Sequence, residues 1–443
     1  MKVIIIGGVA AGMSAAAKLK REKREAEIVV YEKGDYVSYG ACGLPYYISN
    51  VNDDYRKMLI RSVEEFENSG INCKLHHEVL AVNPAEKKVQ VKDLKTGTVF
   101  LDSYDKLMVA SGARSASPPF PGIELEGVMS LRTMNDGHLM KEKAMDKGVK
   151  NVIIVGAGFI GIELAEAFRE LDKNVTVIEM QDHILNNFEP EIESIAIKEL
   201  IDNKINLRLG EGLVELKGEG HVNQVVTTKG VYDADMVVLA LGIKPNTEML
   251  KDTGVNLAKN GAVIVDREMR TSVEDIYAAG DCAEVYHYVM QQNTFIPLGT
   301  NANKCGRIAG SNLAGKHIEY QGTLGSTAIK IFNVEMAKTG ISQNEALSIG
   351  IESGSSFIET FDHIQYYPGQ SPLWIKVIYE KETKRILGAQ AVGNKGAVLR
   401  IDVFAAAIQG NMTTEQLGMT DFCYAPPFAG VWDAVNIACN AAR

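Results

Sequence analysis

The chain has 443 residues, of which 46% are hydrophobic and 23% charged, and its formal net charge at pH 7 is −10. This length predicts about two to four domains with ample core, and the acidic balance argues against a general binder of nucleic acid or of anionic membranes. No apolar run reaches the roughly 18 residues of a membrane span, and the apolar N-terminus is too short for a signal peptide. We therefore expect a cytoplasmic protein.

The N-terminal segment predicts a dinucleotide-binding unit. An apolar, β-branched run over 2–6 is typical of a parallel strand buried on both faces, and it leads into the turn Gly7–Gly12, a helix over 13–23 and a second strand that ends at Glu32. In this layout the glycines allow a tight turn, the amides of the helix N-terminus face a pyrophosphate, and the acid binds a ribose hydroxyl. Val9 departs from the strict pattern, which has a glycine at that position.

The predicted first helix is basic towards its end, where it carries Lys18, Lys20, Arg21, Lys23 and Arg24. The usual interpretation of such a run is a solvated helix face. In an acidic protein, these clustered cations could also form a phosphate-binding patch.

Cys42 lies in the glycine-rich turn 38–45, directly after this unit. The six cysteines are scattered, with neither a C-x-x-C pair nor the spacing of a zinc site, which argues against a disulfide framework and against a metal site. Cys42 could be a redox centre or a small buried hydrophobe. The other cysteines are interpreted as structural, namely Cys73, Cys282, Cys305, Cys423 and Cys439.

A second dinucleotide-binding unit follows a linker-like stretch, Pro118–Gly122. A buried strand over 152–155 leads into Gly156–Gly161, which matches G-x-G-x-x-G without exception, and a helix and a strand then lead to Glu179. Two such units imply two bound nucleotides. Because Glu179 would accept a hydrogen bond from a free 2′-hydroxyl and repel a 2′-phosphate, we expect NADH to be preferred to NADPH.

The rest of the chain is predicted to complete the first unit and then to form a third unit without a nucleotide-binding motif. A strand and the turn Gly280-Asp281 precede a helix over 301–313, so the first unit is predicted to be split by the second. From about residue 323, strands and a helix over 398–408 carry no nucleotide signature. The predicted fold class is α/β, with two Rossmann-like dinucleotide-binding domains and a C-terminal α+β dimerisation domain. The predicted domains are 1–117 with 248–322, then 118–247, then 323–443.

Four motifs together resemble the two-dinucleotide flavoprotein disulfide reductases over nearly the whole chain: Gly7–Gly12 with Glu32, Gly156–Gly161 with Glu179, Leu241–Asn246 and Tyr277–Asp281. The resemblance implies FAD on the first unit, with Asp281 near its ribityl chain, and NADH, with NADPH as the alternative, on the second. For FAD it implies Gly7, Gly8, Val9, Ala10, Ala11, Gly12, Glu32, Lys33, Val79, Ala110, Gly112, Asp281 and Ala302. For the nicotinamide nucleotide it implies Gly156, Gly158, Phe159, Ile160, Gly161, Glu163, Glu179 and Gly242.

The cysteine pattern divides that family. Members of the glutathione-reductase type have a second cysteine five residues after the first and a histidine near the C-terminus, but here Tyr47 follows Cys42 at that distance and no histidine follows His363. The chain therefore resembles the single-cysteine branch, which contains coenzyme A-disulfide reductases, NADH oxidases, NADH peroxidases and CoA-dependent sulfur or polysulfide reductases. Ala10 stands where peroxidases and water-forming oxidases have a histidine, which disfavours peroxide chemistry.

Within this branch the chain is most similar to the CoA-disulfide reductases. In that group, tyrosines matching Tyr366 and Tyr424 reach the active cysteine from the partner subunit, which implies a homodimer. The resemblance implies that CoA contacts Ser14, Lys18, Arg21, Ser38 and Ala41, with Asn303 and Lys304 contributed by the partner.

The mechanism implied by this resemblance has Cys42 forming a mixed disulfide with CoA, so that a second CoA replaces the missing resolving cysteine. The flavin and Tyr424 are expected to lower the pKa of Cys42 or to protonate the departing thiolate. Glu163 is interpreted as a nicotinamide contact rather than only a helix-dipole partner.

Three alternatives stay open. A CoA-dependent NADH:sulfur or polysulfide reductase would use the same groups, although such members often carry a rhodanese-like extension that this sequence lacks. An NADH oxidase is the second alternative. From a different class, the chain could be a flavin redox sensor or electron carrier, but a carrier needs no thiol.

Overall fold

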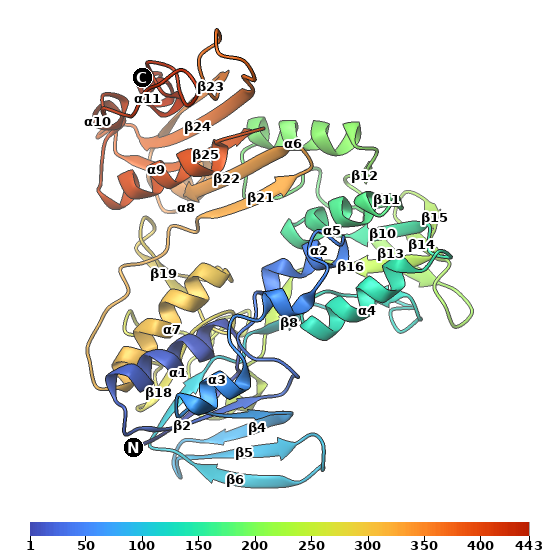
Figure 1. The fold of residues 1–443 in the computed structure, drawn as a ribbon, viewed down its shortest axis with the longest axis vertical. Coiled ribbons are helices and arrows are strands. Elements are labelled where there is room, and N and C mark those ends of the chain that lie inside the picture. The colour runs from blue at the N-terminus through green and yellow to red at the C-terminus, as the bar shows by residue number, and fades with distance from the viewer. Residues whose placement is uncertain (443) are drawn as a thin grey trace.

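A computed structural model describes residues 1–442, which form two units with parallel sheets and a C-terminal unit with an antiparallel sheet (Figure 1). The predicted α/β fold class is confirmed. Figure 1 shows the C-terminal unit, coloured orange to red, at one end of the molecule and the small sheet β4–β6 at the other. Within the described residues, no helix is long and apolar enough to cross a bilayer.

The first unit is built on a five-stranded sheet with the order β18-β7-β1-β2-β3. The central strand is apolar and buried because it is covered on both faces, and its Ile4 pairs in parallel with Val29 on one side and Leu107 on the other. The strands are β1 (Lys2–Ile6), β2 (Glu27–Glu32), β3 (Asn72–Leu75), β7 (Lys106–Val109) and β18 (Ile276–Ala278). Since β18 pairs with β7, two segments far apart in sequence share this sheet. The domain boundaries themselves stay a prediction.

Two helices of this unit, α1 (Ala10–Glu22) and α7 (Gly299–Leu313), pack closely against each other. Glycine permits this approach, because a Cβ atom on Gly306 would lie 2.3 Å from the carbonyl oxygen of Ala11. Helix α1 begins three residues before the predicted residue 13, because the end of the glycine turn already forms its first turn. The smaller elements are α2 (Leu44–Ile48), α3 (Val63–Asn68), β4 (His77–Asn83), β5 (Lys88–Asp93), β6 (Val99–Ser103), β8 (Ala113–Ser115), β17 (Ile243–Pro245), β19 (Val285–His287) and β20 (Gln292–Thr294).

The second unit repeats the parallel architecture with the strand order β12-β11-β10-β16-β9. The sheet strands are β9 (Val128–Met129), β10 (Asn151–Val155), β11 (Asn174–Ile178), β12 (Asn206–Arg208) and β16 (Met236–Leu239). Its helices are α4 (Met134–Met145), α5 (Phe159–Glu170) and α6 (Pro190–Asp202), and an antiparallel sheet comprises β13 (Leu213–Lys217), β14 (Gln224–Thr227) and β15 (Val231–Asp233). The linker-like stretch Pro118–Gly122 packs on this sheet, since the amide of Leu216 donates to the carbonyl oxygen of Pro121 over 2.9 Å.

The segment after Cys42 packs on the second unit rather than on the first. Leu44 and Ile48 of α2 belong to the same buried cluster as Ile162 of α5 and Met140 of α4. The cysteine turn therefore bridges the two nucleotide-binding units, with its glycine-rich start on one and its helix on the other.

The C-terminal unit is an antiparallel sheet with the order β21-β22-β25-β24-β23, covered by α9. Every residue of its central strand β25 is buried, which explains the apolar run there. The elements are β21 (Thr327–Ile331), β22 (Val334–Gly340), α8 (Gln343–Ser348), β23 (Ser353–Phe361), β24 (Pro372–Glu380), β25 (Ile386–Gly393), α9 (Ala397–Gln409), α10 (Thr414–Gly418) and α11 (Ala434–Asn440).

Candidate active site

The first glycine turn forms an anion-binding helix start. Gly7 adopts φ +101, and a Cβ atom on Gly12 would lie 1.9 Å from the Gly7 carbonyl oxygen, so both positions require glycine. Val9 caps α1 without a side-chain hydrogen bond, and the first turn of α1 carries no acid, which leaves its amides available to an anion. Both carboxylate oxygens of Glu32 accept from backbone amides, from Gly8 over 2.7 Å and from Gly34 over 2.7 Å.

The second glycine turn repeats this geometry. Gly156 adopts φ +110, and Glu179 accepts from the amides of Ala157 over 2.8 Å and of Gln181 over 2.9 Å. Gly158 caps α5 without a side-chain hydrogen bond, and a Cβ atom on it would meet no atom within 4 Å. The space in front of α5 is therefore open to a ligand, and the amides at the helix start face it.

The predicted FAD residues from the distant segments converge on the first turn. A Cβ atom on Gly280 would lie 2.9 Å from the Cβ of Ala11 and 3.8 Å from that of Ala302. The Ala110 carbonyl oxygen lies against Gly7. The other predicted residues do not share one environment. Gly112 and Gly242 adopt positive φ. Val79 is buried in β4, and Lys33 is exposed after β2.

Asp281, predicted to lie near the ribityl chain, forms an ion pair with Arg132. The two side chains approach to 2.5 Å, and the Arg132 Nε also donates to the carbonyl oxygen of Ala113 over 2.9 Å. Arg132 lies at the end of the segment that leads into α4, so this pair joins the two nucleotide-binding units.

The turn that carries Cys42 is fixed at several points. Cys42 sits in a one-turn 3-10 helix, Ala41–Gly43. The amide of Ser38 donates to the carbonyl oxygen of Gly8 over 2.8 Å, and the amide of Ile60 donates to that of Ser38 over 2.8 Å. Ser38 itself adopts φ +51, a left-handed conformation that is unusual for serine. The turn is thus tied to the first glycine turn, which brings Cys42, Ser38 and Ala41 beside the predicted FAD site.

Cys42 differs from most of the other cysteines in its exposure. Cys42 and Cys423 are exposed, whereas the other four are buried. Burial raises the pKa of Cys73 and Cys282 to about 11 and that of Cys305 and Cys439 to about 12, so these thiols stay protonated and inert.

The groups of the same chain that surround Cys42 together disfavour its thiolate. Partial desolvation raises the pKa of Cys42, the carboxylates of Glu163 and Asp281 raise it further, and Arg132 acts in the opposite direction. This direction is set by protein groups of one chain, and the lowering of the pKa expected from the flavin and from Tyr424 of the partner subunit stays a prediction.

Two neighbours of Cys42 are themselves perturbed. Desolvation and the charge of Glu166 raise the pKa of Glu163, which follows the first turn of α5, to about 7. Desolvation and Glu163 raise the pKa of Tyr46 to about 12. Glu166 forms an ion pair with Lys330 and accepts from the amide of Phe332 over 2.7 Å, so it is anchored on the C-terminal unit.

Tyr47, which stands where a second cysteine would lie, forms contacts with α4. Its hydroxyl lies 3.1 Å from the Nδ1 of His138, its carbonyl oxygen accepts from Lys141 over 2.7 Å, and its side chain is buried. Tyr36 approaches the other ring nitrogen of His138 to 3.4 Å. Residue 47 therefore holds α2 on α4 and takes no part in sulfur chemistry.

Five of the residues predicted to contact CoA lie on two adjacent helices: Ser14, Lys18 and Arg21 on α1, and Asn303 and Lys304 on α7. Asn303 donates to the hydroxyl of Ser14 over 2.9 Å. This contact arises within one chain because α7 packs along α1. The expected contribution of Asn303 and Lys304 from the partner subunit stays a prediction. Lys304 is exposed on the same turn of α7, and Lys18 forms an ion pair with Glu22 at 2.6 Å.

Arg21 lines a cavity that sequence reasoning did not foresee. This basic pocket, of about 360 Å³, is lined by Ala17, Lys20, Arg21, Arg24, Arg61, Ser69 and Ile71. Four of these side chains are cationic, and no acid is among the described residues that line it. Arg61 is oriented towards Ser69, whose hydroxyl it contacts at 2.9 Å.

Tyr366 and Tyr424 lie together, since their hydroxyl oxygens are 3.0 Å apart. Both rings are exposed, and the hydrogen bond between the two hydroxyls raises the pKa of Tyr424. Within the described part of the chain, no contact joins either tyrosine to Cys42 of the same chain. Their predicted approach from a partner subunit stays a prediction.

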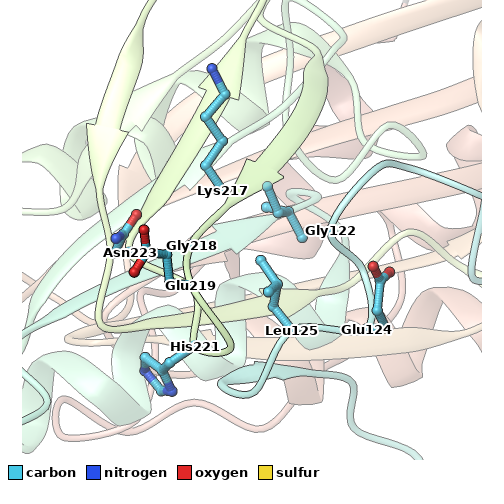
Figure 2. Close-up of a pocket in the computed structure, with 9 residues that line it drawn as sticks. Gly122, Glu124, Leu125, Lys217, Gly218, Glu219, His221 and Asn223 are labelled. Carbon is cyan, nitrogen blue, oxygen red and sulfur yellow. The ribbon is translucent and has the colours of Figure 1, made fainter.

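A larger pocket, of about 740 Å³, lies away from this chemistry (Figure 2). It is formed where the linker around Gly122 and Leu125 crosses the hairpin turn that carries Lys217 and His221. Because it is wide open and shares no residue with either glycine turn or with Cys42, we do not assign the active site to it.

Comparison with known proteins identifies the family. Residues 1–303 match the pyridine nucleotide-disulphide oxidoreductase family, and residues 326–435 match the dimerisation domain of the same family. The chain belongs to this family. It is 40% identical over 436 residues to a CoA-dependent NAD(P)H sulfur oxidoreductase of Pyrococcus abyssi, covering 98% of this chain and 96% of that protein.

Other family members support the same assignment. A coenzyme A disulfide reductase of Staphylococcus aureus is 31% identical over 439 residues, covering 98% of both chains. The crystal structure of reduced Bacillus anthracis CoADR-RHD superposes with a TM-score of 0.96 at 33% identity, covering 99% of this chain and 79% of that one.

The protein is thus an FAD-dependent NAD(P)H oxidoreductase of the group that includes CoA-disulfide reductases, sulfur or polysulfide reductases and NADH oxidases. The residues present fit these cofactors: two helix starts have amides without side-chain caps, each glycine turn is paired with an amide-bound glutamate, and open space lies before Gly158.

Arg132, Tyr46 and Arg61 were not predicted from the sequence. Arg132 and Arg61 stand in segments without any motif, so only their approach in three dimensions reveals them. Lys20 and Arg24 belong to the run of cations for which the sequence offered a phosphate-binding patch as one of two interpretations.

Proposed function

We propose that this protein reduces coenzyme A disulfide with electrons from NADH, through FAD and the single redox cysteine Cys42. The proposal rests on two features that occur together. Cys42 is exposed and has no second cysteine nearby in the sequence, and α1 carries a pocket lined by four cations. A thiol without a resolving partner needs one from its substrate, and a pocket of this charge suits a disulfide whose thiols carry phosphates, as CoA does.

The sulfur step follows thiol–disulfide exchange. The Cys42 thiolate attacks one sulfur of CoA disulfide, forms a mixed disulfide and releases the other CoA as a thiolate, which takes up one proton. Two electrons and one proton then split the mixed disulfide into a second CoA thiol and the Cys42 thiolate. Overall, NADH, one proton and one CoA disulfide give NAD⁺ and two CoA thiols. FAD, when bound, supplies the two-electron transfer between nicotinamide and sulfur.

Individual residues of the chain have distinct parts in this proposal. Gly7–Gly12 with Glu32 would hold FAD, and Gly156–Gly161 with Glu179 would hold NADH. Because both oxygens of Glu179 are engaged by amides, its charge stays in place and would disfavour the 2′-phosphate of NADPH. Arg132 would offset the acids around Cys42 and favour its thiolate.

The dimerisation-domain match supports a homodimer. We infer that the hydrogen-bonded pair Tyr366 and Tyr424 approaches Cys42 of the partner, where a phenol could protonate the departing CoA thiolate. The exposure of both rings within one chain supports this inference.

The test uses the purified holoenzyme. We expect mass spectrometry of the unreduced protein to detect CoA on Cys42, and we expect Cys42→Ser to lose CoA-disulfide-dependent NADH oxidation by at least ~10³-fold, as nucleophile removal usually does. Cys423→Ser, which removes the other exposed thiol, is the matched control and should keep full activity. Full activity in Cys42→Ser would refute the proposal, and a sulfenic or sulfinic acid on Cys42 would indicate oxidase chemistry instead.

Reduction of sulfur or polysulfide with CoA as a bound thiol is the second candidate. It is favoured by the name of the Pyrococcus abyssi relative, which is a CoA-dependent sulfur oxidoreductase. The two candidates differ in stoichiometry: with CoA disulfide each NADH yields two CoA thiols, whereas with polysulfide it yields sulfide while CoA is conserved. Measuring thiol and sulfide per NADH with each substrate decides between them.

A further inference from the structure

The segment that joins β11 to α6 forms two hydrogen bonds with the second glycine turn. At its start, Glu179 accepts from the amide of Ala157 over 2.8 Å. Further along, the amide of Leu185 donates to the carbonyl oxygen of Ala157 over 3.0 Å. The residue at the centre of the nucleotide-binding turn is therefore held through both its amide and its carbonyl by one segment, 179–189, which we call the strap.

The backbone conformation of the strap is locally unfavourable. Leu185 adopts φ +44, a left-handed conformation that is sterically costly for a side chain of this size. Within the described residues, His183 and Asn187 each bury one polar atom, Nδ1 and Oδ1, without a hydrogen-bond partner. Such features persist only where surrounding structure imposes them.

Glu193 of α6 accepts from the amide of Ile184 in the middle of the strap over 2.6 Å, and the C-terminal unit holds the end of the strap. The amide of Glu189 donates to Gln390 Oε1 over 2.7 Å, and its carboxylate accepts from the amide of Gln343 over 2.9 Å. Lys376 Nζ contacts the Glu189 carboxylate at 3.1 Å and both carboxylate oxygens of Glu191 at 2.9 Å. Figure 1 shows α6, which begins directly after Glu189, lying against the C-terminal sheet.

The members of this cluster that come from the C-terminal sheet are buried, whereas the Glu191 side chain is 43% exposed. The side chain of Lys376 is 4% exposed, and Gln390 is 1% exposed. A charged lysine is rarely enclosed this far without carboxylates to compensate it, and removing one member of such a cluster leaves the others without partners. The cluster therefore fixes the end of the strap more firmly than exposed ion pairs could.

We propose that Lys376, through Glu189, is a positioning residue for the nicotinamide nucleotide: it holds the strap so that Ala157 and Glu179 keep their places in the second glycine turn. This inference rests on the proposed assignment of NADH to that turn. It makes the C-terminal unit part of the nucleotide-binding machinery, although none of its own residues belongs to either glycine turn.

The experiment measures nucleotide binding and turnover in the FAD-loaded protein. We expect Lys376→Met to raise the Kd of ADP-ribose and of NAD⁺, measured by calorimetry, and the KM for NADH by about tenfold, while kcat at saturating NADH changes less than about twofold. Lys376→Arg, which keeps the charge, should recover most of the affinity. Gln390→Leu removes a single acceptor from the Glu189 amide and offers a milder variant if Lys376→Met does not fold.

The matched control is Asn333→Ala. Asn333 also joins the C-terminal unit to α6, through Glu199 at 3.0 Å, but at the other end of the helix. It should leave Kd and KM unchanged. Unchanged values in both Lys376→Met and Gln390→Leu, or an equal rise in Asn333→Ala, would overturn the proposal. Because ADP-ribose binding involves neither Cys42 nor CoA, this result is independent of whether CoA disulfide is the substrate.

Discussion

Cys42 is exposed enough to react, but its own chain does not activate it strongly. Partial burial disfavours the thiolate most, Glu163 and Asp281 disfavour it further, and Arg132 favours it. The charged part of this balance lies between the ion pair of Arg132 with Asp281 and an acid on α5. This balance can be shifted in both directions by single substitutions.

For Arg132→Met, we expect the pKa of Cys42 to rise, because the cation is lost and Asp281 is left uncompensated. Below the pKa, each unit of pKa changes the thiolate fraction tenfold, so alkylation by iodoacetamide at pH 7.5 should slow by about 3- to 10-fold. Asp281→Asn should have the opposite effect and speed alkylation. Equal rates in both variants would contradict this account of the sulfur.

The raised pKa of Glu163 makes the free energy of unfolding depend on pH. Its pKa is raised from an ordinary value of 4.5 to about 7, so between these values the folded protein holds a proton that the unfolded chain has lost. The free energy of unfolding should consequently fall as pH rises through this range. At about 1.4 kcal/mol per pKa unit, discounted for partial exposure, we expect Glu163→Gln to gain ~2 kcal/mol relative to the parent at pH 8 but nothing at pH 4. Urea denaturation at both pH values measures the difference, and an equal gain at both would refute it.

At the scale of elements, α1 contributes to two candidate sites, one at each of its ends. Its first turn supplies amides to the predicted FAD site, and its last turn, with Arg61 from the segment before α3, forms the basic pocket. Helix α7 runs along α1 and brings Asn303 to Ser14. One helix thereby connects the flavin site to the proposed binding site for a phosphorylated thiol.

If the basic pocket binds the phosphates of CoA, Arg61→Ala should raise the KM for CoA disulfide by about tenfold, the loss expected for one charge-assisted contact. The KM for pantethine, a disulfide with the same arm but without the nucleotide, should not change. Lys23→Ala removes a cation of the same helix outside the pocket and serves as the control. A matching rise for both disulfides would show that Arg61 acts on the fold instead.

At the scale of the whole molecule, several contacts join the C-terminal unit to the second unit, including Asn333 with Glu199. Glu166 of α5 is anchored by Lys330, and Glu189 before α6 by Lys376. These contacts fix α5 and the strap relative to the antiparallel sheet. A unit that carries no glycine turn thus sets the geometry of one.

The shared active site can be tested with mixed dimers. In a heterodimer of a Cys42→Ser chain and a Tyr424→Phe chain, one site combines both substitutions and the other is intact if Tyr424 reaches Cys42 of its partner. We expect such heterodimers to have about half of the parent activity per dimer, well above either homodimer. Activity no greater than the mean of the two homodimers would place Tyr424 and Cys42 in the same chain.

The sequence alone determined the central strands and the glycine turns of the two nucleotide-binding units, because glycines at fixed spacing, buried β-branched runs and the acids Glu32 and Glu179 are local signals. It also singled out Cys42 as a candidate and showed that Tyr47 stands where a second cysteine would lie. What it could not supply are contacts between segments without motifs. Arg132 beside Asp281, Arg61 beside α1, and Lys376 beside Glu189 each join residues distant in the chain, and no periodicity or spacing encodes such meetings. Only the packing of three units around shared helices decided which charges surround the sulfur and which hold the nucleotide turn in place.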